Sequence, residues 1–240
     1  MVKRILLVCV FLLITACSES EPTVVKKETD PKNPNQEPEL VEETKEDKTE
    51  EYIEFTLPDE QVMVHLEMVP ILYEYIHATK NRQQAIEEMN MHRINVEETD
   101  LYLLEFSCHD ELCSYLLLDQ SKDNQAYLIA DLAKLIQTKI SSDSAKVLFQ
   151  FNRTDTSLPL PLTDLVVVNL NQWEPVALIN ETNETVTLDY TWPIITVEWI
   201  NDTTINALKP DIEEPTSELI TQWQDNGKPN TTISFTINQK

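Results

Sequence analysis

The feature that most constrains this chain is its glycine content. Among 240 residues there is one glycine, Gly227. Loops that cradle phosphate use glycine, because its backbone reaches positive φ and lets a ligand approach closely. A Walker loop, a dinucleotide-binding fingerprint and the G-x-S-x-G turn of α/β-hydrolases are therefore excluded. We expect no nucleotide or other bound cofactor, and turns must be built from Asn and Asp instead.

Apolar residues alternate with polar ones in much of the second half of the chain, the period of half-buried strands. Such segments are Val147–Phe151, Ile195–Trp199 and Ile233–Ile237. Leu165–Leu170 is a continuous apolar run, which predicts a strand covered on both faces. Asn201 and Asp202 lie between two apolar segments and predict a hairpin turn. Residues 130–140 fit a short helix or a longer strand, and the pattern does not decide.

The clearest hairpin is predicted over Leu101–Asp119. Two signals, its cysteines and its apolar alternation, select the same register. That register pairs Cys108 with Cys113, Phe106 with Tyr115 and Leu104 with Leu117.

Residues 51–95 are predicted to be mainly helical. Their apolar side chains recur at spacings of four and three, along one helix face. They are Val62, Leu66, Val69, Tyr73 and Ile76. Asp59 is suited to cap this helix, Pro70 interrupts it, and another helix is expected over 81–91. The expected fold class is α+β, an N-terminal helical segment packed on an antiparallel β meander or sandwich of residues 100–240.

Residues 142–211 resemble blades of a TolB-like β-propeller. The resemblance rests on a strand at 146–151 followed by residues 165–178, with 192–211 similar to the next turn of the blade. A propeller needs at least about four blades, and the chain has room for about two or three. The aspartate and glycine of the blade turn are also missing. The resemblance therefore implies antiparallel β structure and not a complete propeller.

The first seventeen residues have the layout of an export signal. Lys3 and Arg4 precede an apolar run over 5–15, too short for the ~20 residues that span a bilayer. Ile14-Thr15-Ala16-Cys17 then resembles the lipobox of bacterial lipoproteins. The resemblance implies cleavage before Cys17, with diacylglyceryl and N-acyl (palmitate-type) lipid on that cysteine. The mature chain would then be lipid-anchored at the extracytoplasmic face of the cell membrane. The alternative is an ordinary cleaved signal with a cysteine there by chance.

Three regions follow from this reading. Residues 1–16 are the signal peptide. Residues 17–50 have no aromatic residue, four prolines and eleven acidic residues against five lysines, which predicts a disordered tether. Residues 51–240 are expected to form a single globular domain, long enough to bury one core.

The mature chain is strongly acidic. Without Lys3 and Arg4 the 18 basic residues become 16, which against 42 acidic residues gives a net charge of −26. Nucleic acids and anionic headgroups need Lys and Arg, so neither is expected as a partner. The expected partners are the membrane, reached through the lipid, and a protein or cell-wall polymer.

The chain has four cysteines, and a different role is expected for those near the N-terminus than for the other two. Cys9 leaves with the signal and Cys17 takes the lipid. Cys108 and Cys113 are expected to form a disulfide, because exported chains meet oxidising conditions. The C-x-x-C spacing typical of redox motifs is not present. A free thiol pair stays open as an alternative, as does metal or redox chemistry with His109, Asp110 and Glu111.

A cluster of sulfur and imidazole donors lies in the predicted helical segment. Its members are Met63, Met68, Met89, Met91, His65, His77 and His92. Such donors suit copper, but Met63 and Met68 would face different sides of one helix. Glu74 and His77 match half of a di-iron motif without its second copy. We assign no catalytic, cofactor-binding or metal residue. The expected function is a non-catalytic binding or structural module, with an extracellular metal-handling (copper or calcium) lipoprotein as the alternative.

Overall fold

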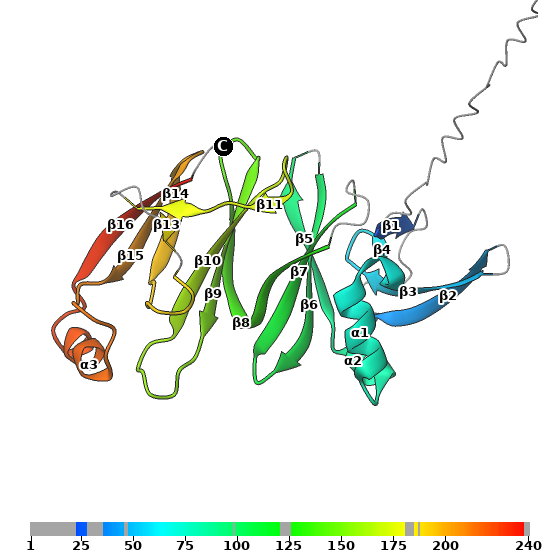
Figure 1. Ribbon diagram of the computed structural model, residues 1–240, viewed down its shortest axis with the longest axis horizontal. Coiled ribbons are helices and arrows are strands. Elements are labelled where there is room, and N and C mark those ends of the chain that lie inside the picture. The colour runs from blue at the N-terminus through cyan, green and yellow to red at the C-terminus, as the bar shows by residue number, and fades with distance from the viewer. Residues whose placement is uncertain are drawn as a thin grey trace, which may run out of the picture.

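Strands dominate the fold. The computed structural model describes residues 23–27, 36–45, 48–97, 99–120, 126–180, 185–186 and 188–237. Within these ranges the chain forms three antiparallel sheets and a few short helices. The sheets stand in a row along the long axis of the molecule, with the first sheet at one end and the last sheet at the other (Figure 1).

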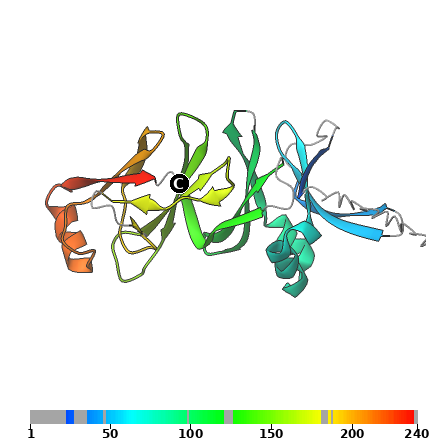
Figure 2. The same ribbon diagram turned by 45° about the horizontal axis from the view of Figure 1, so that its top comes forward.

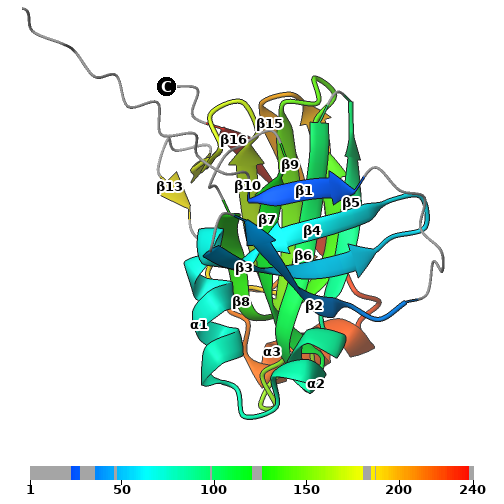
Figure 3. The same cartoon turned by 90° about the vertical axis from the view of Figure 1, so that its right-hand side faces the viewer.

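The first sheet has the strand order β1-β4-β3-β2. Its strands are β1 (Val24–Lys27), β2 (Glu39–Lys45), β3 (Lys48–Thr56) and β4 (Gln61–His65). A 3-10 turn, η1 (Leu66–Met68), and the helices α1 (Pro70–Ala78) and α2 (Arg82–Glu87) follow β4. Pro70 lies at the first position of α1, where its missing N–H breaks no bond, and the Asn81 side chain accepts from Gln84 N to cap α2. Figure 3 shows this sheet crossing steeply over β6 and β7.

The second sheet has seven strands in the order β11-β10-β9-β8-β7-β6-β5. They are β5 (Asn90–Val96), β6 (Thr99–His109), β7 (Leu112–Asp119), β8 (Ala126–Ile140), β9 (Lys146–Arg153), β10 (Leu162–Asn169) and β11 (Glu174–Pro175). The long strand β8 pairs with β7 through its first half and with β9 through its second, and its register shifts along both. Such bulges bend a strand, so the sheet folds at β8 and its two halves face each other.

The third sheet has the order β13-β12-β16-β15-β14. Its strands are β12 (Leu178–Ile179), β13 (Thr185–Val186), β14 (Thr196–Asn201), β15 (Thr204–Pro210) and β16 (Asn230–Ile237). Helix α3 (Ser217–Asp225) connects β15 to β16, at the end of the row opposite α1 and α2 (Figures 1 and 2). Its cap is Thr216, whose hydroxyl accepts from Leu219 N.

Three apolar cores fill the spaces between the layers. The first lies between the first sheet and β5–β7, the second between the two halves of the folded sheet, and the third between β9–β10 and the third sheet. The middle strands are therefore buried on both faces. In β6, Tyr102 and Leu104 join the first core, while Leu101 and Leu103 join the second. Alternate residues of one strand thus hold adjacent cores together.

The expected α+β class with residues 51–95 mainly helical is wrong. Within that range β3, β4 and β5 are strands, and the helices are confined to 70–78 and 82–87. Val62 and Leu66 of the predicted stripe lie on β4 and η1, so only its second half is helical. The spacing of four misled because β4, a short strand buried on both faces, carries apolar residues at every position from Val62 to Val64.

The predicted register of the 101–119 hairpin is wrong by one residue. Leu104 pairs with Leu116 and Glu105 with Tyr115, and the register shifts beyond Phe106. A one-residue slip moves every side chain to the other face, so Leu116 joins Leu104 in the first core. Because β6 and β7 are apolar on both faces, alternation could not distinguish the two registers.

The other strand predictions are confirmed. Strands occupy 146–153, 196–201 and 230–237, and β14 turns into β15 after Asn201. The undecided segment at 130–140 belongs to strand β8. In β10, Leu165 and Val167 join the third core and Val168 joins the second, so this strand is covered on both faces as predicted.

The described residues of the predicted tether belong to the first sheet. Within 17–50, β1, β2 and the start of β3 are strands. Val24 is 1% exposed and Leu40 packs against the first core, so a few apolar positions anchor this acidic stretch. The region that resembles propeller blades divides between two sheets, with β9 and β10 in the second and β14 and β15 in the third.

Candidate functional site

The candidate site is the closed tip of the β6–β7 hairpin. The sulfur atoms of Cys108 and Cys113 lie 2.15 Å apart, at bonding distance, as the sequence predicted. A two-residue turn, Asp110 and Glu111, joins the strands with positive φ at both positions, as a type I′ turn requires. Ser107 also has positive φ, within the register shift that brings Cys108 level with its partner. Cys108 is exposed and Cys113 is buried.

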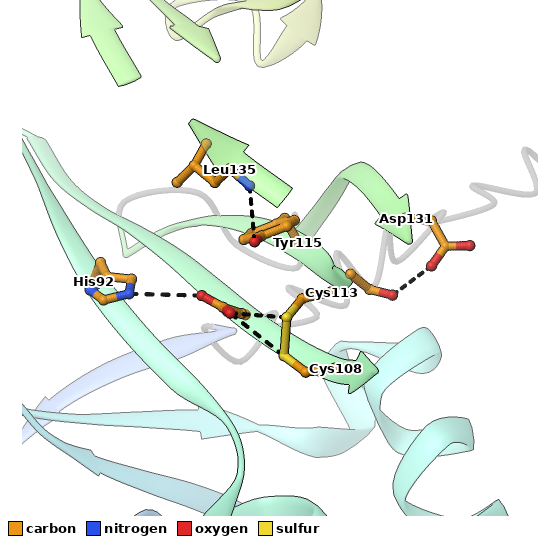
Figure 4. The surroundings of a disulfide bond; sticks show 8 residues. His92, Cys108, Cys113, Tyr115, Asp131 and Leu135 are labelled. Carbon is orange, nitrogen blue, oxygen red and sulfur yellow. Dashed lines mark hydrogen bonds and ion pairs between the residues drawn. A yellow bond between two sulfur atoms is a disulfide. The ribbon is translucent and has the colours of Figure 1, made fainter. Parts of the chain in front are cut away.

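A carboxylate lies against both sulfur atoms (Figure 4). Oε1 of Glu105 is 2.9 Å from Sγ of Cys113 and 3.5 Å from Sγ of Cys108. The other carboxylate oxygen is 4.0 Å from Nε2 of His92, on the neighbouring strand β5. A disulfide carries no S–H, so these short contacts become hydrogen bonds only when the sulfurs are reduced. Glu105 and His92 thus extend the sulfur pair into a row of polar side chains.

Strand β8 supports Cys113 from the other side. Cys113 pairs with Ala133, and the Ser114 hydroxyl donates to Oδ1 of Asp131 over 2.6 Å. The Tyr115 hydroxyl accepts from Leu135 N over 3.2 Å (Figure 4). Between these contacts β8 bulges at Leu132, whose φ is 46° and whose side chain is 51% exposed. An apolar side chain is therefore displayed on strained backbone beside the hairpin tip.

Arg153 holds the bulge in place. Its Nε donates to the Leu132 carbonyl over 2.9 Å, and its Nη2 donates to the Asp131 carbonyl over 2.6 Å. The guanidinium carbon lies 3.8 Å from the ring centroid of Tyr190, a cation–π contact. Burial raises the pKa of Tyr190 to about 12, so its ring stays neutral under Arg153 at physiological pH.

Backbone strain concentrates around this site. Nine of the described non-glycine residues have positive φ, and six of them lie here. They are Ser107, Asp110, Glu111, Leu132, Asp189 and Tyr190. With one glycine in the chain, such positions fall to ordinary residues at a cost of ~1–2 kcal/mol each. Strain of this kind persists where the surrounding contacts fix it, and it gathers at functional sites.

Asp164 lies behind Tyr190. Its Oδ1 accepts from Leu165 N over 2.9 Å and from Asp189 N over 3.2 Å. Burial raises the pKa of Asp164 above its ordinary value, although these two N–H donors and the charge of Arg153 oppose that rise. Relative to the protonated acid, the carboxylate form of Asp164 is therefore less favoured in the folded chain than in the unfolded chain.

This gives a pH-dependent prediction for Asp164→Asn. Because the folded pKa is raised, the wild type loses stability as pH climbs from the ordinary aspartate range, about 4, to the folded pKa. Asn keeps the acceptor oxygen but carries no charge. The variant should therefore match the wild type near pH 3 and become the more stable of the two as pH rises. Urea unfolding of both chains from pH 3 to 7 measures this, and a difference that does not change with pH would contradict it.

A shallow pocket of about 300 Å³ lies between the β3–β4 turn and β5. Arg93 lines it and contacts both carboxylate oxygens of Glu60 at 3.2 Å and Asp100 at 2.6 Å. Lys26 of β1 contacts the same two carboxylates. These charges neutralise one another across two sheets. We therefore interpret the pocket as a structural junction and not as a binding site.

The structure places the predicted site residues in different surroundings. The Cys108–Cys113 pairing is confirmed, while Cys17 and the lipobox lie outside the described residues. His109 is 85% exposed, and the Glu111 carboxylate pairs with Lys134 at 2.8 Å, away from the sulfurs. The sequence reasoning missed Glu105 and Arg153, and it assigned His92 to the copper cluster and not to the disulfide site. A signal for Glu105 was its position three residues before Cys108, but the bulge that turns it toward the sulfurs leaves no pattern.

The methionines and histidines of the proposed copper cluster have different surroundings. Met89 and Met91 are buried in the first core. His65 stacks on Tyr52, and His77 stacks on Tyr73 with its Nδ1 2.9 Å from the Tyr73 carbonyl. Of this group, His92 alone contacts the disulfide site.

The comparisons with known proteins give no relative. No protein-family description, no curated protein and no solved structure matches the chain. In the part of the chain that the structure describes, every helix is too short or too polar to traverse a bilayer. The function must therefore be inferred from the residues themselves.

Proposed function

We propose that this chain is a lipid-anchored extracytoplasmic lipoprotein that acts as a non-catalytic binding or structural module. The observation that carries the proposal is the sulfur pair at bonding distance in the β6–β7 tip. Disulfides persist in compartments outside the reducing cytoplasm, which is where the lipobox of the first seventeen residues would place the chain. The lipobox and the disulfide thus both favour the extracytoplasmic side of the membrane.

The described strands limit how far the body can stand from the proposed anchor. Cys17 precedes Thr23, the first described residue, by six positions. An extended chain spans at most about 3.6 Å per residue, so the lipid would lie within about 22 Å of Thr23. The first sheet would therefore face the membrane, and the third sheet would lie at the far end of the row. A row of sheets joined by shared cores suits a spacer or a display platform.

Replacement of Cys17 tests the anchor. Cys17→Ser should abolish incorporation of labelled palmitate and move the protein from the membrane fraction to the soluble one, since no acyl chain can then attach. Cys9→Ser is the matched control, because it removes the cysteine inside the predicted signal peptide and should leave both readouts unchanged. Mass spectrometry of the wild type should find an acylated peptide that begins at Cys17. An unlabelled wild type, or a Cys17→Ser chain that still fractionates with membranes, would refute the proposal.

A further inference from the structure

We propose that the β6–β7 tip is a redox-controlled site for a zinc-type metal ion, with Cys108, Cys113, Glu105 and His92 as its ligands. This proposal goes beyond the lipoprotein function and does not depend on the lipid. In the described ranges, Glu105, Cys108 and Cys113 are the one group of three or more His, Cys, Asp or Glu residues whose ligand atoms gather closely enough to hold an ion, all within 4.8 Å of one another.

The Glu105 oxygen and the two sulfur atoms already lie near the spacing of three ligands in a tetrahedral site. With Zn–S of about 2.3 Å and Zn–N or Zn–O of about 2.0 Å, neighbouring ligand atoms lie about 3.3–3.8 Å apart. Oε1 of Glu105 is 2.9 and 3.5 Å from the sulfurs, and its Oε2 is 4.0 Å from Nε2 of His92. The exposed side chain of His92, which lies outside the close group, must turn toward the sulfurs, and the sulfurs must separate to about 3.8 Å. Reduction of the disulfide permits that movement.

The donor set selects the metal. Two thiolates with an imidazole and a carboxylate suit zinc, whereas calcium takes six to eight oxygen ligands. The other carboxylates of the tip do not compete, since Glu111 pairs with Lys134, and Asp110, 89% exposed, lies 3.5 Å from Nε2 of His109. His92 and Glu105 lie on adjacent strands of one sheet, so the two ligands other than the sulfurs come from neighbouring backbone.

The chemistry balances with a dithiol as the reductant. A thiolate of the dithiol attacks the exposed Cys108 sulfur and breaks the Cys108–Cys113 bond, and the Cys113 sulfur leaves beside Glu105. The second thiol then resolves the mixed disulfide. The dithiol is oxidised to its own disulfide, and the protein gains two electrons and two protons. Metal binding displaces those two protons as both thiols become thiolates.

Cobalt titration of the full-length chain in detergent, with and without prior reduction by a dithiol that is then removed, tests the site. Co²⁺ replaces Zn²⁺ as a spectroscopic probe. The reduced chain should bind one Co²⁺ with a thiolate-to-metal absorption band, and the oxidised chain should show no such band. Glu105→Gln and His92→Ala should each weaken binding at least about tenfold, the loss typical even of groups that only orient ligands. His109→Ala is the matched control, since this imidazole adjoins Cys108 but faces solvent.

Each contrary outcome overturns the proposal. A reduced chain without the absorption band excludes a thiolate site. A band that persists in Glu105→Gln and His92→Ala with affinities within twofold of the wild type excludes the four-ligand site. Glu105 and His92 are 27% and 53% exposed, so these variants should fold, and circular dichroism of each reduced variant verifies it. Because the readout is metal binding, its failure leaves the Cys17 anchor untouched.

Discussion

Replacing Phe149 by Ala is expected to lower the free energy of unfolding by about 3–5 kcal/mol. Phe149 is fully buried in the second core, where its ring lies 6.1 Å from that of Phe151. Its strand β9 is also covered on the opposite face, where Leu148 joins the third core. A cavity at Phe149 therefore loosens the strand that holds two cores together, so the whole row should lose stability as one unit.

Urea unfolding measures this effect with two probes. Trp173 lies in the second core and the other three tryptophans lie toward the third-sheet end, so fluorescence reports that half of the row, while far-UV circular dichroism reports every strand. Both probes should shift together to lower urea. Ile200→Ala is the matched control, because Ile200 is 56% exposed and its truncation should cost less than about 0.5 kcal/mol. A small loss at Phe149, or a shift seen by one probe alone, would contradict the shared-core arrangement.

The strands of the second half were predictable because their surroundings leave a simple pattern. Strands β9, β14 and β16 were found from alternation, and β10 from its continuous apolar run. The first half misled for the opposite reason. Short strands covered on both faces, such as β4, have no period of two, and the methionines and leucines around them also suit helices. Stacking of sheets in a row is a long-range arrangement that local spacing does not encode.

The site was predictable only in part, because most of its contacts depend on how strands pair and not on local spacing. The cysteines could be paired because they lie five residues apart in a chain whose first residues predict an export signal. Their neighbours could not be found, since a one-residue error in the register of β6 and β7 places Glu105 opposite the wrong partner. Arg153 comes from a strand about forty residues beyond Cys113, and its contact with Leu132 depends on the pairing of β8 with β9.

Arg153→Met is expected to lower the free energy of unfolding by about 2 kcal/mol. The substitution keeps a long apolar side chain. It removes the charged hydrogen bonds to the carbonyls of Asp131 and Leu132, which contribute about 1.5–3 kcal/mol. It also removes the cation–π contact with Tyr190, which contributes about 0.5–1 kcal/mol. Both hydrogen bonds are exposed, so water can bind the freed carbonyls in the variant. The net loss of unfolding free energy is therefore smaller than the sum of these contributions. Without the guanidinium, fewer contacts stabilise the positive φ of Leu132, so the bulge should relax toward an ordinary strand conformation.

The relaxation should reach the disulfide site, because Cys113 pairs with Ala133 next to the bulge. Amide hydrogen exchange should therefore rise over 130–135 and at Cys113, in addition to the loss measured by urea unfolding. Lys209→Met is the matched control, since it removes the other described cation–π contact, with Nζ 3.6 Å from the Trp192 ring, from a different sheet. That control should cost less than about 1 kcal/mol and leave exchange at Cys113 unchanged. Equal losses in the two variants, with exchange at Cys113 unaltered in both, would mean that Arg153 contributes only its ring contact and that the bulge is fixed by the strands alone.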